Sequence, residues 1–416
     1  MKKKERKRSF LRYGMTMFAL LLGMAGCGTQ RGEATGGIET LTGRPGITAD
    51  HKATATPEGE DTLSVVVSPD MTGEPELSEK DDSAAVLLRA LEGMTLAEKV
   101  GQMFLVRCPE NGIEGITEYY VGGYVLFAKD FEGETKTSIK EKIEAYQETS
   151  EIPLLISVDE EGGSVVRVSR YSEFRESAFL SPRELYASGG MERIAKDTKE
   201  KAELLLSLGI NVNLAPVCDI SQNKEAFMYA RSFGGTWEET ADYVATVVKT
   251  AKEAGLGSVL KHFPGYGDNA DTHKGIVYDT RSYETYTESD FKPFFAGMDA
   301  GAGAVMVSHN IVQCMDGEVP ASLSPEVHRI LREELSFDGV ILTDDLYMDA
   351  IQDFTGKEAA AVTAVLAGND MLCCTDFEVQ IPAVIAAVAD GRISEEQIDA
   401  SVLRILKWKA ELGLLQ

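Results

Sequence analysis

Residues 256–273 read Leu256-Gly257-Ser258-Val259-Leu260-Lys261-His262-Phe263-Pro264-Gly265-Tyr266-Gly267-Asp268-Asn269-Ala270-Asp271-Thr272-His273, an apolar run followed by a polar, glycine-rich one. The apolar run predicts a buried strand, and the residues from Lys261 onward predict a loop at its end. Asp271 and His273 stand two positions apart, so a loop can bring their side chains together. An imidazole paired with a carboxylate can act as a proton shuttle near neutral pH. The segment therefore indicates a strand followed by a loop that carries candidate catalytic groups.

Short apolar runs of this kind recur along the chain, and most are separated by amphipathic stretches long enough for helices, such as 191–208, 236–254 and 357–367. Runs that are apolar throughout predict strands buried on both faces, and therefore a parallel sheet. Eight strand–helix units over about 330 residues fit an α/β fold, the (β/α)8 TIM-type barrel. The eight runs are Gln102–Arg107, Gly122–Phe127, Leu154–Val158, Val212–Val217, Gly257–Leu260, Ala304–Ser308, Val340–Leu342 and Asp370–Cys373.

A doubly wound open sheet is the alternative architecture. No Gly-x-Gly-x-x-Gly follows the first predicted strand, which argues against a dinucleotide-binding version of that fold. Thr95-Leu96-Ala97-Glu98 is a capping box and predicts the start of a helix just before the first strand. Residues 400–412 predict a C-terminal helix with an apolar face, which leaves no room for a second domain.

The composition argues against several classes of function. The 416 residues are 44% hydrophobic and carry a formal net charge of −26, a globular composition with a strong acidic excess. Such a chain repels phosphates, so nucleic acid is not an expected partner. The cysteines other than Cys27 are scattered and lack metal-type spacing, so we expect neither a disulfide framework nor a metal site.

The N-terminus has the pattern of a secretory signal. Several lysines and arginines precede an apolar stretch at 13–24, and Ala25-Gly26-Cys27 follows it. Small residues before a cysteine are typical of a bacterial lipoprotein signal, although Met24 stands where Leu is usual. We expect residues 1–27 to direct export and Cys27 to carry a lipid that anchors the chain on the outer face of the membrane. A plain signal peptide or an uncleaved anchor is the alternative.

The rest of the chain divides into two parts. Residues 28–82 are rich in Thr, Gly, Glu and Pro and predict a disordered tether. Residues 83–416 contain the barrel pattern and are expected to form a single, monomeric catalytic domain.

Polar residues follow most of the predicted strands, where the active site of such a barrel is built. A ring of ionisable groups around a cleft suits glycosidic chemistry, in which one group protonates the leaving oxygen and another attacks or stabilises the anomeric carbon. The groups are Asp159-Glu160-Glu161-Gly162-Gly163, Asp219, Lys261-His262 with the following loop, His309-Asn310 and Asp344-Asp345.

Each of these groups also has a structural interpretation. Asp344 and Asp345 can cap the following helix, since Asp is a good N-cap residue. Asp159 can form a salt bridge with Arg167, and Asp268 beside Gly267 fits a turn. His262 and His309 can be buried histidines that do not touch a substrate.

Six motifs in order make the chain from Met94 onward resemble glycoside hydrolase family 3, in particular its single-domain bacterial β-N-acetylglucosaminidases, or β-hexosaminidases. Each motif alone is modestly specific, and the six together are very specific. They are Met94-Thr95-Leu96-Ala97-Glu98-Lys99-Val100-Gly101-Gln102-Met103-Phe104, Val158-Asp159-Glu160-Glu161-Gly162-Gly163, Asn213-Leu214-Ala215-Pro216-Val217-Cys218-Asp219, Arg231-Ser232-Phe233-Gly234, Lys261-His262-Phe263-Pro264-Gly265 and Gly339-Val340-Ile341-Leu342-Thr343-Asp344-Asp345-Leu346-Tyr347-Met348.

The resemblance implies a role for each matching residue. Asp344 would be the nucleophile, with Asp345 capping the helix, and His273 would be the general acid/base, oriented by Asp271. The loop with this dyad is typical of the N-acetylglucosaminidase branch and implies a 2-acetamido sugar. The positions that match the family's sugar-binding residues are Asp159, Arg167, Arg231, Lys261 and His262.

Two positions depart from the family's pattern. Tyr266 replaces a His that is usual between the two glycines, and Thr272 replaces the usual Ser of Asp-Ser-His. Neither change removes a proposed catalytic group, but Tyr266 puts leaving-group specificity in doubt.

The sequence thus predicts an exported, lipid-tethered, exo-acting retaining β-N-acetylglucosaminidase for peptidoglycan-derived muropeptides or related GlcNAc glycosides, without metal or cofactor. A β-N-acetylglucosaminide phosphorylase is an alternative, because a histidine acid/base does not repel an incoming phosphate. An inactive sugar-binding lipoprotein is a third possibility, disfavoured because Asp344, Asp271 and His273 are all present.

Overall fold

The structure is a computed structural model that describes residues 79–355 and 360–415. These residues belong to one compact unit, Glu74–Gln416. The predicted signal peptide, Cys27 and nearly all of the predicted tether lie outside the described residues. The first helix, α1 (Glu79–Gly93), begins shortly before the predicted domain boundary at Ser83. Among the helices described, none is long and apolar enough to cross a membrane.

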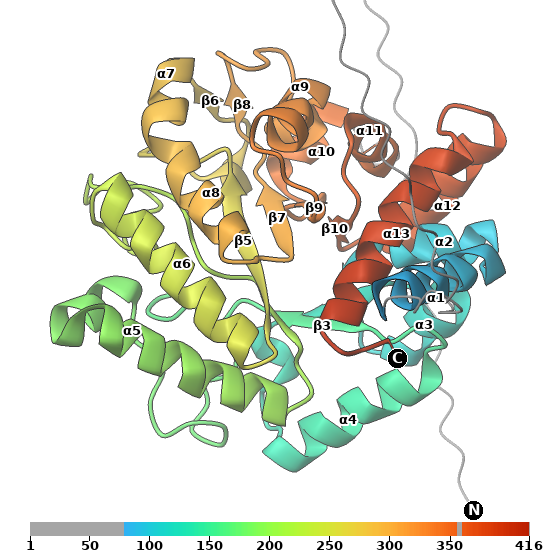
Figure 1. The fold of residues 1–416 in the computed structure, drawn as a ribbon, viewed down its shortest axis with the longest axis horizontal. Helices are drawn as coiled ribbons and strands as arrows, with labels where there is room; N and C mark the ends of the chain where they lie inside the picture. Colours follow the sequence, from blue (N-terminus) through green and yellow to red (C-terminus); the bar gives the residue numbers. More distant parts are fainter. Residues whose placement is uncertain (1–78, 356–359, 416) are drawn as a thin grey trace, which may run out of the picture. The chain divides into compact units, whose positions relative to one another are not determined.

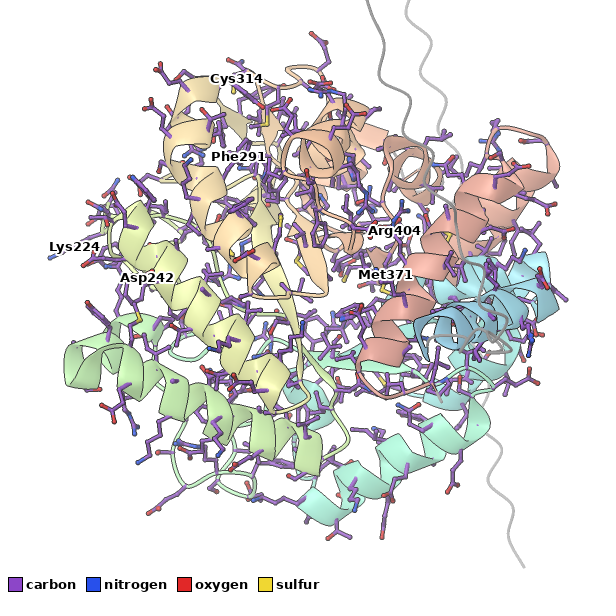
Figure 2. The ribbon with its side chains drawn as sticks, viewed as in Figure 1. Lys224, Asp242, Phe291, Cys314, Met371 and Arg404 are labelled. Carbon is purple, nitrogen blue, oxygen red and sulfur yellow. The ribbon has the colours of Figure 1, made fainter. Side chains whose placement is uncertain are left out.

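Eight parallel strands form the barrel that the apolar runs predict (Figure 1). They follow one another around the sheet in the order β10-β1-β2-β3-β4-β5-β7-β9, and every pair in this sheet is parallel. A bridge between Leu342 of β9 and Met371, which is labelled in Figure 2, brings the two ends together. The strands are β1 (Phe104–Arg107), β2 (Gly123–Leu126), β3 (Leu155–Val158), β4 (Val212–Asn213), β5 (Gly257–Phe263), β7 (Ala304–Val307), β9 (Val340–Thr343) and β10 (Leu372–Cys374).

Helices form an outer layer around these strands, and α5, α6 and α8 pack side by side along one flank (Figure 1). Each strand is followed by at least one helix, so the predicted (β/α)8 architecture is confirmed. The remaining helices are α2 (Leu96–Gln102), α3 (Gly112–Tyr119), α4 (Lys136–Thr149), α5 (Pro182–Ser207), α6 (Trp237–Glu253), α7 (Tyr283–Thr285), α8 (Phe291–Asp299), α9 (Pro325–Arg329), α10 (Asp349–Thr355), α11 (Ala360–Ala367), α12 (Phe377–Ala389) and α13 (Glu395–Glu411), with short 3-10 or π turns η1 (Ala128–Asp130), η2 (Thr272–Lys274), η3 (Tyr286–Asp290), η4 (Ala321–Leu323) and η5 (Ile330–Glu334).

Side-chain caps fix where several helices start. Thr95 accepts a hydrogen bond from the backbone N–H of Glu98, and the Glu98 carboxylate accepts one from the backbone of Thr95, which is the predicted capping box. Ser181 caps α5 in the same way, although the sequence places the start of that helix only at residue 191. A break at Gly189 and Gly190 divides α5, and the periodicity of the sequence detects only the part after this break.

Strand β5 is longer than predicted. The sequence ends the strand at Leu260 and starts the loop at Lys261, but the strand continues through Lys261 and His262 to Phe263. Both polar residues are almost completely buried, with exposed fractions of 1% and 4%. Carboxylates on neighbouring elements neutralise Lys261, and hydrogen bonds satisfy His262, as the next subsection describes, so their polarity does not end the strand.

A small second sheet lies after β5 and β7. In it β6 (Tyr278–Asp279) pairs in parallel with β8 (Ile311–Val312). These two strands are too short to leave a pattern in the sequence. Their pairing fixes the far end of the loop that carries Asp271 and His273, because Tyr278 follows that loop by only a few residues.

Candidate active site

A cavity of about 480 Å³ opens where the carboxyl ends of the barrel strands meet. Seven of the predicted site residues line it, and the eighth, Asp271, lies next to it and contacts His273. The fold therefore brings together groups that are far apart in the sequence. The seven are Asp159, Arg167, Arg231, Lys261, His262, His273 and Asp344.

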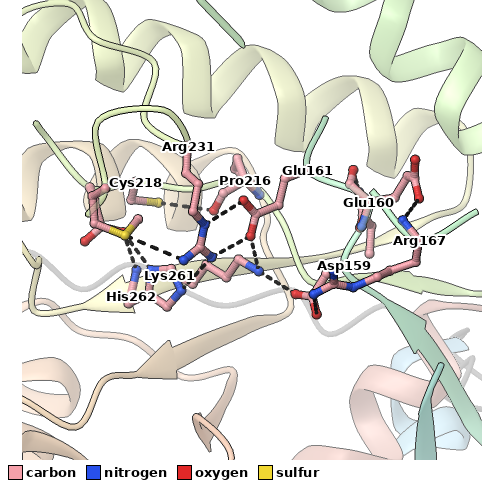
Figure 3. Close-up of polar contacts among 12 residues, drawn as sticks. Asp159, Glu160, Glu161, Arg167, Pro216, Cys218, Arg231, Lys261 and His262 are labelled. Atoms are coloured by element: carbon pink, nitrogen blue, oxygen red, sulfur yellow. Dashed lines mark hydrogen bonds and ion pairs between the residues drawn. The ribbon is translucent and has the colours of Figure 1, made fainter. Parts of the chain in front are cut away.

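One wall of the cavity is a buried network of charges centred on Lys261 (Figure 3). The Lys261 Nζ lies 2.6 Å from an oxygen of Asp159 and 2.7 Å from an oxygen of Glu161. Arg231 donates two hydrogen bonds to the same Glu161 carboxylate, at 3.0 and 2.7 Å. Arg167 forms a looser ion pair with Asp159, at 3.5 Å. The predicted salt bridge between Asp159 and Arg167 therefore exists, and it lies within the candidate sugar-binding site.

Glu161 holds this network together, although the sequence analysis assigned it no role. Its side chain is 3% exposed. Burial alone would raise the pKa of this carboxyl, but the charges of Arg231 and Lys261 outweigh burial and hold the pKa far below its usual range. Burial likewise opposes the charge on Lys261, yet Asp159 and Glu161 raise its pKa above the usual value. Glu161, Lys261 and Arg231 are therefore all ionised at neutral pH.

His262 is oriented by a second residue that the sequence analysis left unassigned. The Asp219 carboxylate lies 2.7 Å from His262 Nδ1 and accepts a hydrogen bond from the His262 backbone. The other ring nitrogen, Nε2, lies 3.2 Å from the Arg231 guanidinium. Asp219 also accepts a hydrogen bond of 2.7 Å from the backbone N–H of Tyr266. One buried carboxylate thus fixes both the His262 imidazole and the start of the loop that carries Asp271 and His273.

Asp344 follows β9 and faces the cavity. Burial among protein atoms opposes its ionisation, but His309, His262 and His273, together with the backbone N–H of Asp345, outweigh burial and lower its pKa. A carboxylate held ionised in a pocket is suited to attack an electrophilic carbon.

Asp345 has a different role from the one predicted. Helix α10 begins only at Asp349, so Asp345 is not its cap. Instead Asp345 accepts hydrogen bonds from the Tyr347 backbone at 3.0 Å and from the Thr375 hydroxyl at 2.7 Å, which fixes the turn after β9. Burial raises the pKa of Asp345, in contrast to that of its neighbour Asp344.

His273 and Asp271 form the predicted pair. One Asp271 oxygen lies 2.7 Å from His273 Nδ1 and accepts a hydrogen bond of 3.0 Å from the His273 backbone. The histidine side chain is 56% exposed, whereas the aspartate is 14% exposed. With Nδ1 engaged, Nε2 is the ring atom available to a substrate. Helix α10, which follows Asp344, packs against the short turn η2 that carries His273.

The two positions that depart from the family's pattern contact each other. The Tyr266 hydroxyl is hydrogen-bonded to the Thr272 hydroxyl, and both residues are almost completely buried. Burial raises the pKa of Tyr266, so its phenol stays protonated. The pair links the end of β5 to the residue just before His273.

Arg281 also holds the loop that carries Asp271 and His273. It donates hydrogen bonds to the Gly265 carbonyl at 2.7 Å, to Asp290 at 2.7 Å and to Asp279 at 2.7 Å. Asn269 donates a hydrogen bond of 2.6 Å to the same Asp279. The loop is therefore tied to the barrel at its start and in its middle.

His309 matches its structural interpretation. It is fully buried, its Nδ1 lies 2.7 Å from the Ser322 hydroxyl, and its Nε2 lies 3.1 Å from the Asp345 carbonyl. Burial lowers the pKa of this histidine. Within residues 79–355 and 360–415, no group of three or more His, Cys, Asp or Glu side chains is arranged so that it could bind a metal ion.

A family model described as the glycosyl hydrolase family 3 N terminal domain matches residues 95–408. The chain belongs to glycosyl hydrolase family 3. The predicted family is thereby confirmed, and with it the expectation of an enzyme of the glycoside hydrolase type. The match starts within one residue of the Met94 boundary given by the sequence motifs.

Similar proteins are named for activity on hexosaminides. The chain is 34% identical over 304 residues to a β-hexosaminidase of Xanthomonas campestris pv. campestris (strain B100), covering 71% of this chain and 85% of that protein. It is 30% identical over 332 residues to β-hexosaminidase A of Pseudoalteromonas piscicida, covering 73% and 56%. The solved structure of a glycoside hydrolase family 3 β-N-acetylglucosaminidase from Paenibacillus sp. str. FPU-7 superposes with a TM-score of 0.73 at 33% identity, covering 77% and 63%. The chain thus spans less than two thirds of the latter two proteins.

Proposed function

We propose that this family 3 protein is an exo-acting, retaining β-N-acetylglucosaminidase that hydrolyses terminal β-GlcNAc from peptidoglycan-derived muropeptides or related glycosides. The observation that carries the proposal is the placement of Asp344 and the His273–Asp271 pair at one cavity, whose wall is the charged network of Lys261, Arg231 and Glu161.

In the first chemical step, the Asp344 carboxylate attacks the anomeric carbon while His273 Nε2 gives its proton to the departing glycosidic oxygen. The carbon–oxygen bond breaks, the leaving group departs as an alcohol, and a covalent glycosyl-enzyme remains. In the second step, His273 removes a proton from a water molecule that attacks the same carbon and displaces Asp344. Two inversions give net retention of configuration. Asp271 fixes the orientation of the imidazole through its contact with Nδ1.

Donors on the wall of the cavity bind the hydroxyls of the sugar in this proposal. Lys261, Arg231 and Arg167 are held by carboxylates, so their remaining N–H groups are fixed in direction before the substrate enters. Hydrogen bonds from charged donors are stronger than those from neutral donors. They stabilise the transition state as the sugar ring distorts toward it. The names of the similar proteins and the dyad loop support a 2-acetamido sugar.

The proposal includes an exported location. Residues 1–27 would direct secretion, and lipid on Cys27 would hold the enzyme on the outer face of the membrane, where shed cell-wall fragments occur. Replacing Cys27 by Ala should move the protein from the membrane fraction to the medium. Unchanged membrane association of the Cys27→Ala protein would contradict lipid anchoring.

A substrate panel tests the activity. We expect rapid release of the aryl group from aryl β-GlcNAc and slow release from aryl β-glucoside and β-xyloside, with the β-anomer of GlcNAc as the first product seen by NMR. Equal rates on all three glycosides would contradict the proposed sugar, and an α-anomer would contradict retention. GlcNAc 1-phosphate in place of free GlcNAc in phosphate buffer would identify a phosphorylase instead.

A further inference from the structure

Phe227 lies on the loop after β4 and contacts the side chain of the proposed acid. The centre of its ring lies 6.1 Å from the centre of the His273 ring, and the two ring planes meet at 62°. Phe227 lines the catalytic cavity and also a neighbouring open groove, which contains Asp271 and Lys274. It lies outside the six motifs that carry the family resemblance. Its ring therefore stands between the cavity and the loop that carries His273.

A small apolar cluster holds the Phe227 ring in place. The ring packs against Val217, Met228 and Tyr266, which are all almost completely buried. Its centre lies 6.0 Å from the centre of the Tyr266 ring, at an angle of 61°. The contacts of Phe227 with His273 and with Tyr266 thus both have the tilted geometry that pairs of aromatic rings prefer. Protein neighbours on two loops therefore fix the position of the Phe227 ring.

The same ring also contacts an arginine of the charged wall. The Arg231 guanidinium carbon lies 5.5 Å from the centre of the Phe227 ring. Met228 ties the two residues together, because its sulfur lies 3.7 Å from Arg231 Nη1 and its carbonyl accepts a hydrogen bond of 3.1 Å from the Arg231 backbone. Arg231 in turn donates two hydrogen bonds to the buried Glu161 (Figure 3). Phe227 is therefore held in a fixed relation to the charged network.

His273 has no comparable tie through its own hydrogen bonds. Among the described residues, its side chain is hydrogen-bonded only to Asp271, which stands two positions earlier on the same loop. Asp271 sets the rotation of the imidazole within that loop, but it moves with the loop and cannot set the distance from His273 to the sugar. The histidine side chain is 56% exposed, so little packing holds it. Phe227 lies on a different loop, and its contact supplies the reference that Asp271 cannot supply.

We propose that Phe227 is a positioning residue, which places His273 Nε2 at the glycosidic oxygen by contact with the imidazole while its own ring is held against Arg231. This inference rests on the proposed function and deepens it, because it makes placement of the acid depend on a residue that also touches the sugar-binding wall. A misplacement of about 1 Å can lower a rate about a hundredfold. The ring should therefore affect proton transfer by His273 and leave the attack by Asp344 unchanged.

A series of leaving groups separates this role from others. The quantity measured is kcat/KM for aryl β-GlcNAc glycosides, of which only those with poor leaving groups need a proton from His273. We expect Phe227→Leu, which keeps a large apolar side chain, to lower kcat/KM about 3- to 10-fold for poor leaving groups, the effect of losing one aromatic contact, and to change it little for good ones. Phe227→Tyr keeps the ring and should restore most of the loss. Equal losses across the series, or no loss, would overturn the inference.

A double substitution shows whether Phe227 acts through His273. In the His273→Ala protein the group to be positioned is gone, so adding Phe227→Leu should cause no further loss of kcat/KM. Losses that multiply would mean that Phe227 acts independently of the acid, and they would refute the positioning role.

Inhibition by free GlcNAc reports on the Arg231 side of the ring, because this ligand fills the sugar site without a leaving group. We expect its Ki to be the same for Phe227→Leu and for the unsubstituted protein. A Ki that rises as much as kcat/KM falls would assign Phe227 to sugar binding, and the inference would be wrong.

Tyr229→Leu is the matched control. Tyr229 lies on the same loop and contacts an arginine in the same way, with the Arg183 guanidinium carbon 3.9 Å from its ring centre, but it lines neither the cavity nor the groove. Its ratio of kcat/KM between poor and good leaving groups should equal that of the unsubstituted protein. If Phe227→Leu does not fold, Phe227→Met takes its place in the same series, with the same expected loss.

Failure of the inference differs from failure of the proposed function. A protein that cleaves aryl β-GlcNAc glycosides, but whose Phe227→Leu variant shows no dependence on the leaving group, refutes only the positioning role. A protein that cleaves no GlcNAc glycoside refutes the proposed function and the inference with it.

Discussion

Lys409 offers a quantitative test of how this barrel is stabilised. The lysine lies on α13 and is completely buried, and its Nζ lies 2.7 Å from the amide oxygen of Gln102 on α2. No carboxylate pairs with Lys409 among the residues described. Burial therefore lowers its pKa to about 7 from the ordinary value of 10.5.

The cost of keeping Lys409 in the core follows from that pKa. Between pH 7 and 10.5 the unfolded chain binds a proton at this lysine and the folded protein does not, so the free energy of unfolding rises with pH across this window. Below pH 7 both states are charged and the penalty is complete. A fall from 10.5 to about 7 corresponds to about 5 kcal/mol, of which about 3 kcal/mol is relieved between pH 6 and 9.5.

Lys409→Met removes this titration while keeping an unbranched side chain of similar length. The variant loses the hydrogen bond to Gln102, at a cost of about 1 kcal/mol that does not depend on pH. We expect it to be more stable than the unsubstituted protein at pH 6, with the difference shrinking by about 3 kcal/mol at pH 9.5. Urea unfolding of both proteins at each pH measures the difference, in which other titrating groups cancel.

Lys407→Met serves as the control, because Lys407 lies on the same helix but is 54% exposed and only loosely paired with Asp338 at 3.5 Å. Its stability relative to the unsubstituted protein should vary little with pH. If the difference for Lys409→Met is equally independent of pH, Lys409 keeps its proton in the folded protein, and the reasoning from burial is wrong.

Three further predictions concern the active site. Asp344→Asn should lower hydrolysis of aryl β-GlcNAc at least about a thousandfold, as measured by release of the aryl group, and retained activity would exclude Asp344 as the nucleophile. His273→Ala should lower kcat/KM far more for poor leaving groups than for good ones, and equal losses on an aryl series would exclude the acid role. Glu161→Gln should destabilise the fold by about 3–5 kcal/mol in urea unfolding, because Arg231 and Lys261 lose their shared carboxylate; an unchanged midpoint would show that the network contributes no net stability.

Periodicity and residue type were sufficient to predict the barrel. Eight apolar runs became the eight strands, and the box from Thr95 to Glu98 became a helix cap, because both signals depend on neighbours in the sequence. The polar groups after strands, together with the motifs of the family resemblance, also named the seven predicted residues that line one cavity. Their roles in catalysis and sugar binding stay predictions until the variants are measured.

Partners that are distant in the sequence were not predictable in the same way. Glu161 and Asp219 were visible after their strands, but nothing local indicates that one neutralises Lys261 and Arg231 and the other orients His262. A buried lysine needs a carboxylate nearby, but Lys261 was predicted to lie in a loop, where water solvates its charge. Because the sequence does not show that Asp159 and Glu161 lie beside Lys261, this lysine was predicted to start a loop, whereas it lies within β5.

The two proposed catalytic groups are held in opposite ways, and this difference has a consequence for specificity. Asp344 follows directly from a barrel strand, so its position is fixed by the sheet. His273 lies on a half-exposed loop whose position depends on separate ties, among them the Tyr266–Thr272 pair and Arg281. Substitutions at these ties can move the acid relative to the leaving group while the nucleophile and the charged sugar site stay in place. Under the proposed function, the departure from the family's pattern at Tyr266 and Thr272 would therefore act where leaving groups are selected, and the recognised sugar would be set elsewhere, by Lys261 and its carboxylates.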